Sequence, residues 1–205
     1  MSPKLSEEDK EARKRQIVAA AKEVFKRKGY ERATLKDIVE EAGMSRGWIY
    51  LYYPDKNTIF RAMLDQLDEE MAHELTGLLQ RHAAVIDALH AFFENYKHLA
   101  ATAREDLYPS IYEYFIAGWR EPNTSQYFAM RYERVVALIE AFLTRGIESG
   151  EFRKETPVTM IAKTMMSGLD GILIHILSFG ADRIESDDQI DKLARRVEEA
   201  LLKLA

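Results

Sequence analysis

The sequence of 205 residues contains no cysteine, few helix-breaking residues (10 glycines and 5 prolines) and no apolar segment at its N-terminus. The lack of cysteine excludes a disulfide scaffold and every thiolate-ligated zinc or iron–sulfur site. The charged start, MSPKLSEEDKEARKRQ, excludes a secretory signal peptide. The most apolar segment, 157–179, is interrupted by Lys163, Asp170 and His175, so we do not expect it to cross a membrane. These absences indicate a cytoplasmic protein without a membrane partner.

Apolar residues make up 47% of the chain, which is enough for a sizeable core. Charge is unevenly distributed. Residues 1–60 contain 13 lysines and arginines against 10 acidic residues, whereas residues 61–205 contain 16 against 24. The first segment is therefore better suited than the second to meet phosphate groups.

The periodicity of apolar residues is helical throughout, and no alternating strand pattern occurs between turn signals. Hydroxyl caps, glycines and prolines divide the chain into about nine helices, at 8–28, 35–42, 46–52, 56–79, 82–103, 107–119, 123–149, 157–179 and 187–204. We expect an all-α fold with an N-terminal three-helix head (residues 1–55) and a C-terminal helical body (residues 56–205).

The segment TLKDIVEEAGMSRGWIYLYYPDK, residues 34–56, has the pattern of a helix-turn-helix. Thr34 and Ser45 each cap a short helix, and Gly43 permits the tight turn between them. Apolar residues of the first short helix would face Ile49, so the second helix would present its other side to the major groove. The alternative is an incidental corner of two packed helices.

With these residues in view, the sequence resembles the TetR family of transcriptional regulators over about residues 10–62, and its opening MSPK and basic first helix are similar to the YfiR-type members. The resemblance implies base-reading positions on the second short helix and contacts to the DNA backbone around them. It assigns these roles to Thr34, Lys36, Ser45, Arg46, Gly47, Trp48, Tyr50, Tyr52 and Lys56.

Two positions depart from the family pattern: Trp48 replaces a small residue, and Tyr53 replaces phenylalanine. An indole has one donor and a large apolar face, so Trp48 is suited to a thymine methyl or a sugar. Packing roles for Trp48 and Tyr50, and a solvated charge at Arg46, are the alternatives.

Eight aromatic residues lie in the 25 positions from Tyr108 to Tyr132. They form either ordinary core or the wall of a pocket for a planar or amphipathic ligand. Asp170, in an apolar helix, is either a structural anchor or a polar contact to that ligand. The effector is expected to be apolar and aromatic, and a cationic group on it would suit the ring faces and the carboxylates of Asp170 and Glu113. An anionic effector would instead need a basic partner, for which Arg131, Arg134 and Lys163 are the candidates. The expected effector-binding residues are Phe92, Phe93, Tyr96, Tyr112, Phe115, Trp119, Phe128, Tyr132 and Asp170.

The helix expected at 157–179 is apolar nearly all round, and the last helix carries one apolar stripe. We expect these two helices to form half of a four-helix homodimer interface, as the resemblance also implies. The expected interface residues are Ser167, Gly168, Gly171, Ile190, Leu193, Val197 and Leu201.

No catalytic motif, metal site or cofactor site is expected. Glu70-x-x-His73 is a single Glu-x-x-His pair, and His90, Glu94 and His98 lack ligands from a second helix. We therefore expect a regulator, not an enzyme: a repressor released from a palindromic operator in double-stranded DNA by a small effector. The alternatives are a helical small-molecule-binding protein or enzyme without a DNA role, and an effector-free DNA-binding protein.

Overall fold

The computed structural model describes residues 6–202, and every regular element in that range is a helix. The helices are α1 (Glu7–Lys28), α2 (Leu35–Ala42), α3 (Arg46–Tyr50), α4 (Lys56–Arg81), α5 (Val85–Thr102), α6 (Tyr108–Gly118), α7 (Pro122–Glu148), α8 (Val158–Phe179), α9 (Ala181–Ile184) and α10 (Ser186–Leu202). The predicted all-α fold is confirmed, whereas the four-residue α9 was not predicted. The opening MSPK and the predicted helix end near Leu204 lie outside the described residues.

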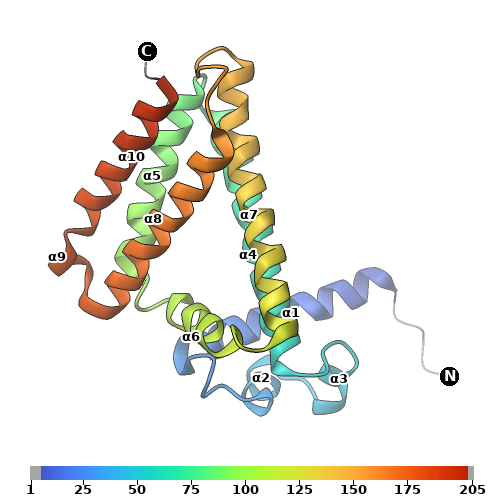
Figure 1. Cartoon of the computed structure of the whole chain (residues 1–205). Coiled ribbons are helices and arrows are strands. Elements are labelled where there is room, and N and C mark those ends of the chain that lie inside the picture. Colours follow the sequence, from blue (N-terminus) through green and yellow to red (C-terminus); the bar gives the residue numbers. More distant parts are fainter. Residues whose placement is uncertain (1–5, 203–205) are drawn as a thin grey trace.

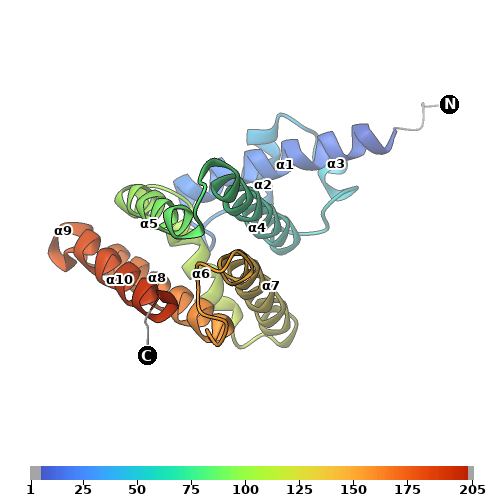
Figure 2. The ribbon, with the colours of Figure 1, turned by 90° about the horizontal axis from the view of Figure 1, so that it is seen from above.

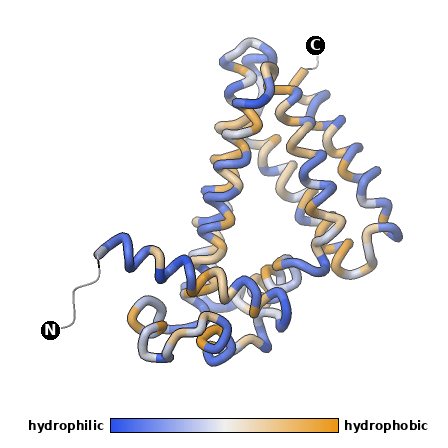
Figure 3. Tube along the Cα trace, turned by 180° about the vertical axis from the view of Figure 1, so that it is seen from behind, coloured by the Kyte–Doolittle hydropathy of each residue, from blue (hydrophilic) through white to orange (hydrophobic). Residues whose placement is uncertain are grey.

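The first three helices and the start of α4 form the head, at the bottom of Figure 1. Side chains at the predicted caps begin α1 and α2: Ser6 accepts a hydrogen bond from the Asp9 amide, and Thr34 accepts one from the Asp37 amide. The first turns of α1 extend beyond the rest of the head and are hydrophilic (Figure 3), whereas Ile17 to Phe25 supply its buried face.

The body consists of the remaining helices. α4 and α7 rise side by side from the head, α8 and α10 pack together on the opposite side, and α5 packs against α4 and α10 (Figures 1 and 2). α6 lies across the base of this arrangement and contacts both the head and α8. The short α6 therefore connects the two parts of the molecule.

α8 is the one helix among the described residues with the length and composition of a membrane span. One side of it is buried in the body core, through Ile161, Ala162, Met165, Leu169, Ile172, Leu173 and Ile176. A core helix of a globular protein has the same composition, so this arrangement accounts for the apolar sequence without a membrane.

The buried apolar residues form two clusters, and the division between them differs from the division along the sequence. The head cluster includes Ile59, Phe60, Met63 and Leu64 of α4, together with Ile111 and Tyr114 of α6, among others. The predicted boundary between residues 55 and 56 therefore passes through a shared core, and a separate head domain stays a prediction.

Candidate functional site

α2 and α3 form the helix-turn-helix unit. α2 ends at Gly43, whose φ of 62° lies in the left-handed region that glycine adopts without strain. Ile38 and Ile49 are fully buried in the same core as Phe25 of α1, and the Gln16 side-chain amide donates a 3.1 Å hydrogen bond to the Ala42 carbonyl. These contacts hold the two short helices as one unit on α1.

The outer face of α3 is accessible. Trp48 and Tyr50 are each 43% exposed, and Arg46 donates a 3.0 Å hydrogen bond to the Tyr50 hydroxyl. A Cβ on Gly47 would meet no atom within 4 Å, so packing inside the protein does not require glycine there. Ser45 begins the helix without a capping hydrogen bond from its side chain. These residues share one exposed surface, as the sequence predicts, and their contact with DNA stays a prediction.

The flanking candidates are more involved in holding the head together. Thr34 and Asp37 form the capping box of α2, and Asp37 also pairs with Lys28 at 2.7 Å. Lys36 is exposed and lies 3.7 Å from Glu40, whereas Tyr52 is half-buried against the head core. The α2 N-terminus is therefore fixed by side chains from two helices.

The Asp37 carboxyl is expected to titrate well below its ordinary pKa. The Lys28 ammonium, followed by the amide and hydroxyl of Thr34, lowers the Asp37 pKa from 3.8 to about 2. Because the folded-state pKa is depressed, the stabilisation of α2 is complete above pH 4 and is lost as the pH falls toward 2. Carboxyl NMR titration checks this, with Lys28→Met raising the pKa; an unchanged value near 3.8 in the wild type would contradict the capping geometry.

Lys56 differs from its expected role. Its ammonium donates to the carbonyls of Tyr30 (2.7 Å) and Ala33 (2.9 Å) in the loop between α1 and α2, and lies 4.3 Å from the Tyr30 ring centroid. Burial lowers its pKa. The Lys56 ammonium cannot bind the Tyr30 and Ala33 carbonyls and reach a DNA phosphate at the same time. The predicted phosphate contact would therefore require these hydrogen bonds to break.

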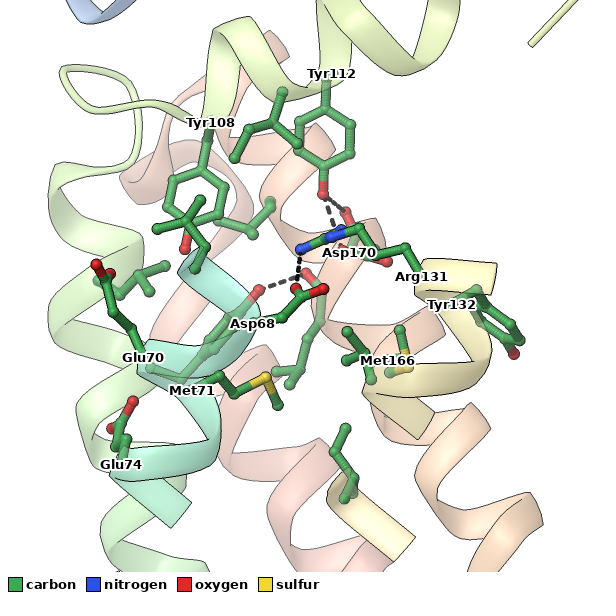
Figure 4. A pocket seen from close by; sticks show the side chains of 18 of the residues that line it. Asp68, Glu70, Met71, Glu74, Tyr108, Tyr112, Arg131, Tyr132, Met166 and Asp170 are labelled. Atoms are coloured by element: carbon green, nitrogen blue, oxygen red, sulfur yellow. Dashed lines mark hydrogen bonds and ion pairs between the residues drawn. The ribbon is translucent and has the colours of Figure 1, made fainter. Parts of the chain in front are cut away.

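A cavity of about 530 Å³ lies in the body, enclosed by α4, α5, α6, α7 and α8 (Figure 4). Its wall is mostly apolar, with aromatic side chains from three helices: Phe92, Tyr96, Tyr108, Tyr112, Phe115, Phe128 and Tyr132. This volume is within the range of small-molecule sites. Many of the predicted aromatic residues therefore line a cavity, and its role as a ligand pocket stays a prediction.

Seven of the nine predicted effector residues line this cavity, and two do not. Phe93 points instead into the body core and is only 2% exposed. Trp119 lies at the end of α6, is 63% exposed, and stacks with the Arg120 guanidinium at 5.3 Å. Phe92 lies on the side of α5 that faces the cavity, whereas Phe93 lies on the side that packs into the body core.

Arg131, one of the basic candidates named from the sequence, lines the cavity, whereas the carboxylates that α4 brings to it were not predicted. Asp68 is 7% exposed and pairs with Arg131 at 2.7 Å, and Glu70 and Glu74 also lie in the wall. The burial of Asp68 could have been predicted from its position between Leu64 and Met71, in an apolar stripe of its helix. Burial raises the pKa of Asp68, and the two arginines Arg131 and Arg134 oppose that rise.

Asp170 is in the cavity wall and accepts a 3.1 Å hydrogen bond from the Tyr112 hydroxyl (Figure 4). Its carboxyl is open to water in the cavity but enclosed by protein on most sides, and this enclosure raises its pKa despite the opposing effects of Tyr112 and Arg131. Burial, together with the nearby Asp170 carboxylate, also raises the pKa of the Tyr112 hydroxyl. Both predicted roles of Asp170, anchor and ligand contact, are compatible with this position.

The predicted dimer residues divide into two groups. Ile190, Val197 and Leu201 are buried in the core of their own chain, so the α10 stripe is not an outer surface. A Cβ on Gly168 would lie 2.8 Å from Leu193, which makes both part of the packing between α8 and α10. Only Ser167, which is exposed, and Gly171, whose Cβ would meet nothing within 4 Å, face outward. For the other five, packing within the chain already accounts for the apolar pattern, because an amphipathic pattern does not distinguish burial within a chain from burial between chains. Their place in a dimer interface stays a prediction.

A helix-turn-helix head joined to a helical body with an internal cavity is typical of DNA-binding regulators that carry the DNA-binding unit and a ligand cavity on the same polypeptide. Comparison with known proteins supports this class. Residues 17–63 match the model of bacterial regulatory proteins of the tetR family, and residues 88–187 match that of the tetracyclin repressor-like C-terminal domain.

Relatives cover nearly the whole chain. It is 34% identical to the uncharacterized HTH-type transcriptional regulator YfiR of Bacillus subtilis over 90% of both proteins, and 27% identical to the HTH-type transcriptional repressor Rv1474c of Mycobacterium tuberculosis over 86% of this chain and 88% of that one. Solved structures with the same fold include GusR of Salmonella enterica (TM-score 0.73, 19% identity, 97% and 99% of the two chains) and FadR of Bacillus subtilis with stearoyl-CoA (0.67, 19%, 93% and 99%). The chain belongs to the TetR family and is a transcriptional regulator, not an enzyme.

Proposed function

We propose that this regulator is a cytoplasmic homodimeric repressor that binds a palindromic operator through α3 and is released by a small apolar, aromatic-bearing effector in the cavity. The observation that carries the proposal is the accessible face of α3, with Arg46, Gly47, Trp48 and Tyr50, on a helix fixed by the buried Ile49. Packing inside the protein does not require a glycine at position 47, and the hydrogen-bond partner of the Tyr50 phenol is Arg46 on the same exposed surface. Contacts to base edges and sugars would use the glycine, the phenol and the Trp48 indole.

Dimerisation would use the outer face of α8. Met160, Thr164, Ser167, Gly171 and Ile174 recur every three or four residues and point away from the core of their own chain. Small side chains in the middle of this face permit close approach of a second α8, and apolar side chains at both ends add buried area. Two copies paired here would place two α3 helices on one side, as a palindrome requires.

Coupling between cavity and head would run through α6 as well as through α4. Tyr112 lies in the cavity wall, and the next residue, Glu113, accepts a 3.2 Å hydrogen bond from the Glu31 amide in the head. Ser110 donates a 2.8 Å hydrogen bond to the Phe25 carbonyl of α1. A ligand that favours another position of α6 would therefore shift the population of head orientations, by no more than its differential affinity.

Binding of the purified protein to palindromic DNA from its own upstream region tests the proposal. Arg46→Ala is expected to lose about 1–3 kcal/mol of discrimination at particular base pairs. Lys36→Ala is the matched control, because a phosphate contact weakens binding to all sequences alike and lowers its salt dependence. If Arg46→Ala changes neither affinity nor sequence preference, α3 is not the reading helix.

A further inference from the structure

The side chains in the cavity wall carry an excess of negative charge. Asp68, Glu70, Glu74 and Asp170 line the cavity, whereas Arg131 is the single lysine or arginine among its lining residues. An aromatic cavity with this balance repels anions and attracts cations, since both carboxylates and ring faces interact favourably with positive charge.

Two of the four carboxylates are neutralised by basic side chains, and the other two accept hydrogen bonds from neutral groups. Asp68 pairs with Arg131 at 2.7 Å, Glu70 pairs with Lys22 at 2.9 Å, and Glu74 accepts a 2.8 Å hydrogen bond from the Asn95 amide. Asp170, like Glu74, forms no ion pair with a lysine or arginine within residues 6–202, but of these two it is the one that accepts its hydrogen bond from a tyrosine of the cavity wall. Its carboxylate is bound only by the Tyr112 hydroxyl, at 3.1 Å.

The charged group that acts on Asp170 is Arg131, whose guanidinium is paired with Asp68, and the other groups next to Asp170 are tyrosine rings that favour a cation. Tyr96 and Tyr112 lie next to it, since their hydroxyls donate to the Leu169 carbonyl and to the Asp170 carboxylate respectively. In Figure 4 the Tyr112 ring and the Asp170 carboxylate face the cavity together. A carboxylate with reduced hydration gains more from an ion pair than one in bulk water.

We propose that the effector is a compact aromatic cation whose positive group pairs with the Asp170 carboxylate. This rests on the proposed function, because it specifies the ligand of the same cavity. The apolar remainder of the ligand would occupy the space between the aromatic side chains of α5, α6 and α7. The cavity volume of about 530 Å³ accommodates such a molecule.

Three compounds that share a 2-naphthylmethyl group and differ in charge test the charge preference in isothermal titration of the full chain. They are the cation trimethyl(2-naphthylmethyl)ammonium, its uncharged carbon isostere 2-neopentylnaphthalene, and the anion naphthalen-2-ylacetate. We expect the cation to bind at least about tenfold more tightly than the neutral isostere, and the anion to bind most weakly.

Two variants test the residue. Asp170→Asn keeps the shape and is expected to lower affinity for the cation at least about tenfold, which corresponds to about 1.4 kcal/mol, while leaving the neutral isostere within about twofold. Glu69→Gln is the matched control: it removes an exposed carboxylate of the same charge from α4 that does not line the cavity, and it should change cation affinity less than about twofold. Thermal melting of both variants verifies that they fold.

The proposal is overturned if the anion binds more tightly than the cation, if Asp170→Asn binds the cation like the wild type, or if the cation does not bind at millimolar concentration. Operator binding is measured separately on the same preparation. Release of the operator by an anionic ligand would refute the proposal of a cationic effector and leave the proposed function intact. Failure to bind any upstream DNA would refute the proposed function itself.

Discussion

Replacement of Gly171 by arginine is expected to yield a monomer that binds operator DNA roughly 10²–10⁴-fold more weakly than the wild type. Gly171 lies on the outer face of α8, where a Cβ meets nothing in its own chain, so the larger side chain fits the isolated subunit. In the proposed dimer the same side chain would separate the two α8 helices. The second half-site contact, which is intramolecular in a dimer, would then be lost.

Sedimentation velocity and DNA titration of the same sample measure both effects. Ala83→Arg adds the same charge in the exposed connection between α4 and α5, and should leave both the dimer and the DNA affinity unchanged. Gly168→Leu gives a useful contrast, because it would clash with Leu193 inside the chain and lower stability. A wild-type protein that sediments as a monomer at micromolar concentration would refute the two-half-site mechanism.

Replacement of Phe60 by alanine is expected to lower the free energy of unfolding by roughly 3–5 kcal/mol. Phe60 is fully buried, and its ring centroid lies 4.8 Å from those of Phe25 and Tyr30 in the head and 4.5 Å from that of Tyr114 in α6. Its removal would leave a void where three segments meet, and edge-to-face contacts with the neighbouring rings would also be lost.

Urea unfolding followed by far-ultraviolet circular dichroism measures the loss. Leu51→Ala is the control, because this neighbouring leucine is 74% exposed and its truncation should change stability by no more than about 0.5 kcal/mol. A Phe60→Ala protein as stable as the wild type would mean that the head and α6 do not share a core.

The sequence predicted the helices and the helix-turn-helix unit because their signals are local. Ser6, Thr34 and Gly43 act within one or two turns of their own helix, and the structure confirms their roles at the helix ends. The aromatic wall was also predictable, since residues 108–132 are dense in large rings. Helix α9 was not, because a four-residue helix between Gly180 and Glu185 carries no periodicity.

The sequence does not indicate which partner a side chain meets. Val197 and Leu201 form the kind of stripe that favours burial, but the pattern contains no information on whether the covering surface belongs to the same chain. Likewise, the chain gives no hint that Lys56 meets carbonyl groups 23 and 26 residues away. Such contacts follow from the packing of α4 on α1, which depends on the whole fold.

The core shared by α1, α4 and α6 limits how such a regulator can be recombined. A chimaera made by joining residues 1–55 to the body of another family member would lose the native ring partners of Phe25 and Tyr30, because Phe60 and Tyr114 lie beyond the junction. A transplant that moves the DNA specificity should therefore also carry residues 56–64, and should match the recipient at Ser110, Glu113 and Tyr114. The exchangeable unit is thus discontinuous in the chain, and a sensor assembled at the linear boundary would begin with a damaged core.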